Sequence, residues 1–368
     1  MHERVNVWHD CDPGHDDALA LLYCLAAEDI RLVGLSSVHG NQTAQKTYAN
    51  IVRTLFLAGR IDLLREIPVV CGAPVPSVRP SQLCAEIHGA SGLGGLDWDE
   101  VDRRIAALGY SLAPPNEPSA DAVADRLHEV FLALGDEPLT LLVTGCQTNV
   151  ARYLGKFPAD AQSGRLRVAA MGGCVGVFGN TGPWQEFNVQ IDPEAFDAVL
   201  RALPEGALTL APLDVTHTVL ADDAVIARME RAAGGEFGRI VGDLLRFFRA
   251  TYRDVFGLPA PPVHDPVAAF YITADRRGRV RERGTEYVSS EPPLVETCLI
   301  KAAVETEGRY TSGAICVERY PAVGQRIPGG RLVRVCERCD VAAFWAEMEG
   351  ALRRLARTSP LSGQAAGE

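Results

Sequence analysis

The stretch VWHDCDPGHDDALALL, residues Val7 to Leu22, determines how the rest of the chain can be interpreted. An apolar run leads into acidic residues and a Pro13-Gly14 turn, after which apolar residues recur at helical spacing. The pattern predicts a strand that ends, turns and starts a helix. Four carboxylates stand at this junction: Asp10, Asp12, Asp16 and Asp17.

Such a cluster needs a counter-charge, because like charges a few ångströms apart raise one another's pKa. A bound cation supplies it, and oxygen-only ligands favour Ca²⁺ or Mg²⁺ over zinc or copper. A simpler interpretation is that Asp16 and Asp17 only cap the helix N-terminus, where carboxylates are favoured. Capping accounts for one or two acids but not for four, so we favour a functional site.

Composition limits the class of protein. The chain has 368 residues, 47% of them hydrophobic, which allows a large core. The 36 basic and 47 acidic residues give a net charge of −11, which argues against a nucleic-acid surface. No apolar run reaches the length of a membrane span, and no signal segment is evident. Ten scattered cysteines are typical of a reducing compartment, so we expect a cytoplasmic protein without membrane contact.

Strand and helix patterns alternate along the chain, which predicts an α/β fold with an open, mostly parallel sheet flanked by helices. We expect a single domain over residues 1–357, with small added strands near the C-terminus, and a disordered tail at 358–368. Strands are expected at 31–38, 67–71, 139–143, 165–171 and 207–211, and helices at 44–57, 119–134, 193–202 and 340–356.

Two irregular regions follow predicted strands, where ligands collect in open α/β sheets. Residues 72–118 are rich in Pro, Gly and Ser, and the glycines of 89–95 would let this loop fold down as a lid that carries His88. The second loop, 179–188, contains Asn180, Glu186 and Asn188. Asn41 also follows a strand, although it could simply cap the next helix.

The acidic residues fit two chemistries. Aspartyl-phosphate enzymes also begin with Asp-x-Asp, but they need a small hydroxyl residue soon afterwards and a lysine, and neither is found in these motifs. Hydrolysis by a metal-activated water needs a carboxylate base and polar groups that hold the substrate. Amide and carboxylate side chains suit the vicinal hydroxyls of a sugar and suit phosphate badly. The residues therefore favour a sugar-binding hydrolase.

Eight ordered motifs, which span about three quarters of the chain, resemble those of the inosine-uridine type nucleoside hydrolases. They are DCDPGHDDA at 10–18, GNQT at 40–43, IHGxSGLGG at 87–95, TGxxTN at 144–149, MGG at 171–173, EFN with DPEA at 186–195, LDVTH at 213–217 and HDP at 264–266. The resemblance implies a Ca²⁺-containing enzyme that cleaves the N-glycosidic bond of ribonucleosides to ribose and a free base.

The resemblance also implies roles for individual residues. Asp12, Asp17 and Asp265 would bind calcium with the carbonyl of Thr144, and Asp12 would also deprotonate the attacking water. Asp10 would support this cluster, and His264 would be the acid for the departing base. The residues expected to hold the ribose hydroxyls are Asp16, Asn41, Asn180, Glu186 and Asn188.

Possible base contacts are His88, Trp184, Phe248 and Tyr252, each of which could instead serve packing or face solvent. Segments 99–118 and 273–293 diverge from the family pattern, and we expect them to border the base pocket. The family resemblance implies a homo-oligomer, a dimer or a tetramer. A relative that binds nucleosides without turnover is the alternative, and an aspartate-dependent phosphatase is a weaker one.

Overall fold

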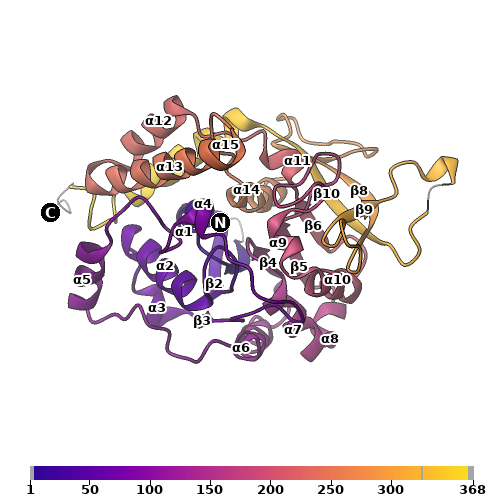
Figure 1. Cartoon of the computed structure of the whole chain (residues 1–368), viewed down its shortest axis with the longest axis horizontal. Coiled ribbons are helices and arrows are strands. Elements are labelled where there is room, and N and C mark those ends of the chain that lie inside the picture. Colours follow the sequence, from indigo (N-terminus) through magenta and orange to yellow (C-terminus); the bar gives the residue numbers. More distant parts are fainter. Residues whose placement is uncertain (1–3, 325, 364–368) are drawn as a thin grey trace.

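The computed structural model describes residues 4–324 and 326–363. These residues form one sheet of ten strands with helices on both faces (Figure 1). The strands run in the order β3-β2-β1-β4-β5-β6-β10-β8-β7, with β9 paired to β8. Every pair from β3 to β10 is parallel, whereas β8 is antiparallel to β10 and β9. The predicted open, mostly parallel α/β sheet is confirmed.

The strands are β1 (Val5–Cys11), β2 (Ile30–Ser37), β3 (Val69–Cys71), β4 (Leu139–Val143), β5 (Leu166–Met171), β6 (Leu208–Ala211), β7 (Val280–Glu282), β8 (Val295–Val304), β9 (Ile315–Val317) and β10 (Arg331–Cys339). The main helices are α1 (His15–Ala26), α2 (Ala44–Leu57), α6 (Ala120–Ala133), α7 (Thr148–Lys156), α10 (Pro193–Ala202), α12 (Asp223–Ala233), α13 (Gly235–Phe256), α14 (Asp265–Arg276) and α15 (Val341–Leu355). Shorter helices are α3 (Leu63–Glu66), α4 (Ala85–His88), α5 (Asp99–Ala107), α8 (Pro158–Gln162), α9 (Phe187–Gln190), α11 (Leu213–Thr216) and the 3₁₀ turn η1 (Pro321–Val323).

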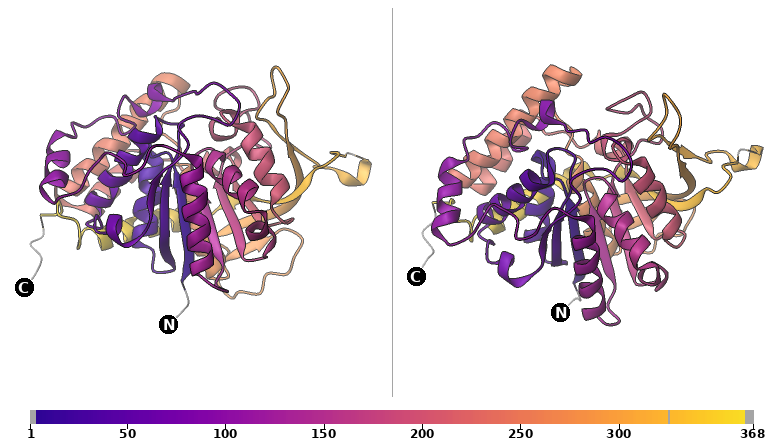
Figure 2. Two further views of the ribbon diagram at one scale, coloured as in Figure 1. Left: turned by 90° about the horizontal axis from the view of Figure 1, so that it is seen from below. Right: turned by 60° about the horizontal axis from the view of Figure 1, so that its bottom comes forward.

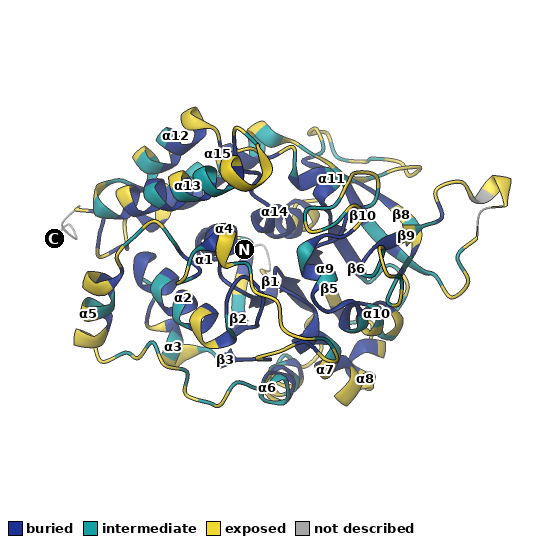
Figure 3. Cartoon of the chain, viewed as in Figure 1, coloured by how far each residue is buried: buried dark blue, intermediate teal, exposed yellow. Residues whose placement is uncertain are grey.

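The two faces of the sheet support separate apolar cores. Successive strand residues point to opposite faces, so in β4 Leu142 joins one core whereas Leu141 and Val143 join the other. The first core packs against α1, α2 and α12 to α15, and the second packs against α6, α7 and α10. Buried strands lie at the centre of the molecule and exposed residues line the outer helices (Figure 3).

The predicted irregular regions contain short helices. Residues 72–118 include α4 and α5, so the expectation of a structureless stretch is wrong there. Helix α5 carries three acidic residues in its first turn and buries Val101 and Ile105 one turn apart, a signal of helix that lies within a region rich in Pro and Gly. Residues 179–188 run into α9, which begins at Phe187.

The C-terminal tail differs from the prediction of disorder. Residues 358–363 pack on the body, where Leu361 is buried and its carbonyl accepts a hydrogen bond of 3.0 Å from the Phe237 amide. The hydroxyl of Thr358 donates to the carbonyl of Ala58 at 2.8 Å. The remaining tail residues, 364–368, lie outside the described residues.

Figure 2 shows the start of β1 at one end of the sheet and many of the long connecting loops at the other. The strands added after α14 extend the sheet on one side, and the segment that follows β9 projects away from the body. Within residues 4–324 and 326–363, none of the helices combines the length and the apolar character needed to cross a membrane.

Candidate active site

The acidic motif lies where the strand order of the sheet reverses. The chain passes from β1 outward to β2 and β3 and later returns to β4 on the other side of β1. In open α/β sheets the loops diverge at such a point and leave a crevice at the carboxyl ends of the strands. Asp10 lies at the end of β1, Asp12 follows it, and Thr144 follows β4.

Asp17 is the centre of the hydrogen-bond network. Its Oδ1 accepts from the Thr144 hydroxyl at 2.7 Å and from the Asp12 amide at 3.2 Å. Its Oδ2 accepts from Asn41 Nδ2 at 3.0 Å and from the Gly14 amide at 3.1 Å. The Asp-Pro-Gly turn and the first turn of α1 therefore fold around one buried carboxylate.

Asp12 is fully buried, and one of its two oxygens is unused. Its Oδ2 accepts from the Asn41 amide at 2.7 Å, whereas its Oδ1 has no hydrogen-bond partner among the described residues. Backbone lies against both oxygens: a Cβ at Gly40 would come within 2.1 Å of Oδ2, and one at Gly145 within 2.9 Å of Oδ1. Glycine at these positions lets the chain pass close to the carboxylate.

The carboxyl groups of Asp12, Asp16, Asp17 and Asp265 all have raised pKa values. Burial is the main cause, and repulsion among neighbouring carboxylates adds to it for Asp12, Asp16 and Asp265. The pKa of Asp16 rises to about 7. None of the four forms an ion pair with a lysine or arginine in the described part of the chain. The cluster is therefore a concentration of negative charge without a protein counter-ion.

This donor set suits a hard cation. Carboxylate oxygens of Asp16, Asp17 and Asp265 lie within 4.8 Å of one another. The grouping differs from the predicted ligand set, because it contains Asp16 where the prediction placed Asp12. The partnerless Oδ1 of Asp12 belongs to the same charge cluster, because Asp16 and Asp17 both raise the pKa of Asp12. The carbonyl of Thr144 accepts from Asn188 Nδ2 at 2.7 Å. Oxygen donors, burial and uncompensated charge together fit Ca²⁺ or Mg²⁺.

A cavity of about 60 Å³ opens above the cluster. Most of the predicted site residues line it: Asp16, Asn41, His88, Thr144, Asn180, Glu186, Asn188, Phe248, Tyr252, His264 and Asp265. Asp12 and Asp17 lie behind this wall. Asp10 lies further back, where its Oδ1 accepts from Asn149 Nδ2 at 2.8 Å and from the Ser36 hydroxyl. Asp10 therefore lies outside the cavity, and its role in supporting the cluster stays a prediction.

Polar side chains occupy the end of the cavity near the carboxylates. Glu186 caps α9, where its carboxylate accepts from the amides of Gly173 at 2.8 Å and Asn188 at 3.0 Å. Asn180 Oδ1 accepts from the Phe187 amide at 3.0 Å, which fixes the side chain in the wall. Glu186 therefore caps α9 and also lines the cavity. The capping hydrogen bonds fix the orientation of its carboxylate in the cavity wall.

The other end of the cavity is apolar except for one buried chain of hydrogen bonds. Ile87, Phe248 and Tyr252 pack together, with Phe256 at the rim. The hydroxyl of Tyr252 lies 2.8 Å from His264 Nε2, and the hydroxyl of Thr216 lies 2.8 Å from His264 Nδ1. Burial lowers the pKa of His264 to about 3 and raises that of Tyr252 well above its usual range. Both groups are therefore neutral near pH 7.

His88 is buried in the cavity wall, and the loop that follows it is folded down on the body. The Nδ1 atom of His88 accepts from the His15 amide at 3.3 Å. Side chains of α2 hold the loop: Asn50 donates to the carbonyl of Ser91 at 2.9 Å, and Lys46 donates to that of Ala90 at 2.6 Å. A Cβ at Gly94 would come within 2.5 Å of the Phe247 ring, so close packing on α13 requires this glycine.

Two expectations about the base end of the cavity do not match the structure. Trp184 is half exposed, contacts the ring of Phe178 and does not line the cavity. The divergent segments 99–118 and 273–293 supply no lining residue either, because α5 and the chain around β7 lie elsewhere. The lining residues that the prediction missed are Cys84, Ile87, Met171, Thr181, Phe187 and Phe256, together with Thr216 behind His264.

Comparisons with known proteins agree with this geometry. The sequence pattern of the family described as inosine-uridine preferring nucleoside hydrolase matches residues 7–346. The pyrimidine-specific ribonucleoside hydrolase RihA of Klebsiella pneumoniae is 35% identical over 319 residues, which cover 86% of this chain and 89% of that protein. RihA of Escherichia coli O1:K1 is 34% identical with the same coverage.

Solved structures share the fold. A purine-preferring ribonucleoside hydrolase from Gardnerella vaginalis superimposes with a TM-score of 0.73 at 24% identity, covering 95% of this chain and 98% of that one. An inosine-guanosine nucleoside hydrolase also gives a TM-score of 0.73, at 21% identity, covering 96% of this chain and 99% of that one.

Proposed function

This chain belongs to the inosine-uridine preferring nucleoside hydrolase family and is a ribonucleoside hydrolase, and on that premise we propose its mechanism and cofactor. We propose that Asp12 deprotonates the attacking water, that Ca²⁺ occupies the carboxylate cluster, and that Tyr252 and His264 protonate the departing base. The observation that carries the proposal is the partnerless, fully buried Oδ1 of Asp12 within a cluster that has no protein counter-ion.

Asp12, Asp17, Asp265 and the carbonyl of Thr144 would hold the ion, and Asp16 also lies within reach of the cluster. When bound, the ion would offset the mutual repulsion of the carboxylates and lower the pKa of a nearby water. A carboxylate of raised pKa is a better base than an ordinary one, provided that it is ionised at the working pH.

The reaction itself needs a proton acceptor and side chains that bind the ribose. Asp12 Oδ1 accepts a proton from water as the water oxygen attacks the anomeric carbon and the bond to the base nitrogen breaks. The positive charge that develops on the ribose ring is stabilised by the buried carboxylates beside it. Asn41, Asn180, Glu186 and Asn188 hold the ribose hydroxyls, since an amide can donate to and accept from a diol and a carboxylate accepts from its hydroxyls.

The departing base leaves with the bonding electrons and needs a proton. Tyr252 Oη–H donates that proton to the base. With the Thr216 hydroxyl donating to His264 Nδ1, the ring proton is on Nε2, from which it donates to Tyr252 Oη and stabilises the negative charge that forms there. The predicted acid, His264, thus acts together with Tyr252.

We further propose a preference for pyrimidine bases. The base end of the cavity is walled by the apolar side chains of Ile87, Phe248 and Phe256. The Klebsiella pneumoniae relative is named pyrimidine-specific. Higher kcat/KM for inosine than for uridine would contradict this preference.

A ribose-release assay with inosine, adenosine, guanosine, uridine and cytidine tests the function, with and without prior chelation of Ca²⁺. We expect release that chelation removes and added Ca²⁺ restores. In Asp12→Asn, which keeps the shape of the side chain, we expect kcat to fall by about 1,000-fold or more. Near-normal turnover in that variant would exclude Asp12 as the base.

The alternatives differ in measurable ways. A silent relative would bind nucleosides with no ribose release, but its retention of every carboxylate and of His264 would then be unexplained. A phosphatase would release phosphate from phosphate esters, and the site offers no lysine among the cavity-lining residues for it. The homo-oligomer and the cytoplasmic location stay predictions, and sedimentation velocity measures the first.

A further inference from the structure

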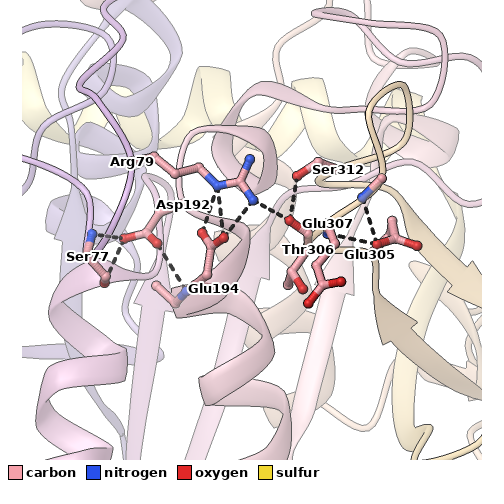
Figure 4. Close-up of polar contacts among 10 residues, drawn as sticks. Ser77, Arg79, Asp192, Glu194, Glu305, Thr306, Glu307 and Ser312 are labelled. Carbon is pink, nitrogen blue, oxygen red and sulfur yellow. Dashed lines mark hydrogen bonds and ion pairs between the residues drawn. The ribbon is translucent and has the colours of Figure 1, made fainter.

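Three segments far apart in sequence meet around Arg79 (Figure 4). The first, which we call the strap, comprises residues 72–84 and leads from β3 into α4. The second is the first turn of α10, and the third is the turn between β8 and β9, residues 305–314. The strap supplies Cys84 to the cavity wall and continues directly into Ile87 and His88.

Arg79 joins all three segments. Its Nε lies 2.8 and 3.0 Å from the two carboxylate oxygens of Glu194, and its Nη2 lies 2.6 Å from Oε1. The same Nη2 also donates to the carbonyl of Thr306. An arginine fork matches a carboxylate at two points and leaves a donor for a third, which lysine cannot reproduce.

A second contact holds the strap to the same helix. The amide and the hydroxyl of Ser77 donate to Asp192 Oδ2 at 2.9 and 3.0 Å, and the hydroxyl of Thr148 donates to the same oxygen at 2.6 Å. Asp192 is fully buried and caps α10 through the Ala195 amide. This anchor is therefore rigid, so the Arg79 contacts decide how the outer part of the strap lies.

The turn between β8 and β9 is braced and holds the other cavity loop as well. Glu305 accepts from the amides of Glu307 at 2.8 Å and Gly308 at 3.0 Å, and the Ser312 hydroxyl donates to the carbonyl of Thr306 at 3.1 Å. Gln185 Nε2 donates to the carbonyl of Tyr310 at 2.6 Å. The turn thus contacts the strap through Arg79 and the loop of Asn180 and Glu186 through Gln185, although it contributes no residue to the cavity.

We propose that Arg79 is a positioning residue: by clamping the strap to Glu194 and Thr306, it holds Cys84, Ile87 and His88 in the cavity wall and so sets the affinity for the nucleoside. This inference rests on the proposed function, because the strap forms the base end of the proposed substrate site. Arg79 touches no reacting atom, so its loss weakens binding of ground state and transition state alike.

The test compares Arg79→Ala, Glu194→Ala and the double variant by steady-state kinetics on the best nucleoside of the ribose-release assay. We expect KM to rise about tenfold in each single variant while kcat stays within about twofold, since uniform binding is lost. The double variant should match Arg79→Ala, because removing Arg79 already breaks the contact with Glu194. Arg79→Lys should recover only part of the loss.

Arg334→Ala is the matched control. Arg334 also forms a fork with a carboxylate, at 2.9 and 3.0 Å from Glu282, and the two side chains are 23% and 21% exposed, against 28% and 32% for Arg79 and Glu194. It lines a different crevice with Thr140 and Arg167. Its removal should leave KM unchanged.

Hydrogen–deuterium exchange gives a readout that does not need turnover. Peptides from residues 74–88 should exchange faster in Arg79→Ala than in wild type, and Arg334→Ala should leave them unchanged. Wild-type KM and wild-type exchange in Arg79→Ala overturn the proposal. If exchange is faster in Arg79→Ala but the wild-type protein releases no ribose, the contact made by Arg79 is supported and the proposed function is contradicted.

Discussion

At the residue scale, burial lowers the pKa of several histidines, and two of them, His264 and His39, serve different purposes. His264 lies in the cavity wall, where both ring nitrogens have hydroxyl partners. His39 lies outside the cavity, with Nε2 3.2 Å from the Thr148 hydroxyl and 3.4 Å from Cys146 Sγ, and its Nδ1 has no partner among the described residues. The first can take part in chemistry, and the second affects only stability.

Tyr252→Phe should separate leaving-group protonation from the attack on the sugar. The variant keeps the ring in the apolar wall but removes the O–H that protonates the base. We expect kcat on uridine to fall by about 100-fold, in the range of general acid catalysis, and kcat on p-nitrophenyl riboside, whose leaving group needs no proton, to change little. Equal losses of kcat on both substrates would mean that another group protonates the departing base.

Tyr153→Phe is the control for this prediction. Tyr153 is also a buried tyrosine, but its hydroxyl donates to Asp160 at 2.8 Å, away from the cavity. Its removal should affect both substrates alike and only through stability.

His39 should make stability depend on pH. Burial lowers the pKa of His39 from 6.5 to about 4, so between these values the unfolded chain binds a proton that the folded chain does not. The free energy of unfolding therefore rises with pH from about 4 to 6.5, by on the order of 3 kcal/mol from this group. Urea unfolding between pH 4.5 and 7.5 should show that the free energy of unfolding of His39→Gln rises less steeply with pH than that of wild type. An identical slope would mean that His39 does not titrate as described.

At the scale of elements, short helices and the packed segment 358–363 occur where composition suggested irregular chain. The run of Pro, Gly and Ser in residues 72–118 is compatible with disorder, yet contacts with α2 and α13 order it. The same holds at the C-terminus. A Cβ at Gly235 would come within 2.2 Å of the carbonyl oxygen of Ser362, so the start of α13 and the tail lie against each other.

Truncation tests whether this tail stabilises the fold. Removing residues 358–368 exposes the surface that Leu361 covers and removes the hydrogen bond from the Phe237 amide. We expect a loss of about 2–3 kcal/mol in the free energy of unfolding, the usual contribution of one buried leucine and a hydrogen bond. Removing only 364–368 is the control and should have no effect. Equal stability of the two truncated proteins would contradict the packing of 358–363.

At the scale of the whole molecule, the central feature is a concentration of buried carboxylates in a protein that already carries a net charge of −11. Elements far apart in the chain hold them together, since Asp12 and Asp17 follow β1, Thr144 follows β4, and Asp265 begins α14. A cation bound there would therefore stabilise the entire fold rather than one loop.

Thermal unfolding in EDTA and in Ca²⁺ measures this effect. We expect Ca²⁺ at about 100 times its dissociation constant to add about 2.7 kcal/mol to the free energy of unfolding, with Mg²⁺ adding less. Because protons compete for carboxylates whose pKa is raised, as for Asp16 at about 7, the gain should be larger at pH 8 than at pH 6. A midpoint that does not respond to Ca²⁺ at either pH would exclude a cation from the cluster.

The sequence alone determined the architecture and most of the site. Alternating apolar strands and amphipathic helices are local patterns, and the carboxyl ends of parallel strands meet at one edge, so Asp12, Asn41 and Thr144 could be placed together without coordinates. The other site residues were predicted from the resemblance of eight sequence motifs to those of the nucleoside hydrolase family. The architecture could be predicted because it depends on periodicity and on residues that are neighbours in the chain, whereas the roles of the site residues rest on the family resemblance and stay predictions.

Only the tertiary structure decided contacts between residues far apart in the chain. Nothing in the sequence joins Thr216 to His264, Arg79 to Glu194 and Thr306, or the tail to α13, because each contact depends on how separate elements pack. Packing also turned Trp184 out of the cavity and moved 99–118 away from it. The protonation states of buried groups were also decided by the tertiary structure, since the pKa of a buried group depends on everything that surrounds it.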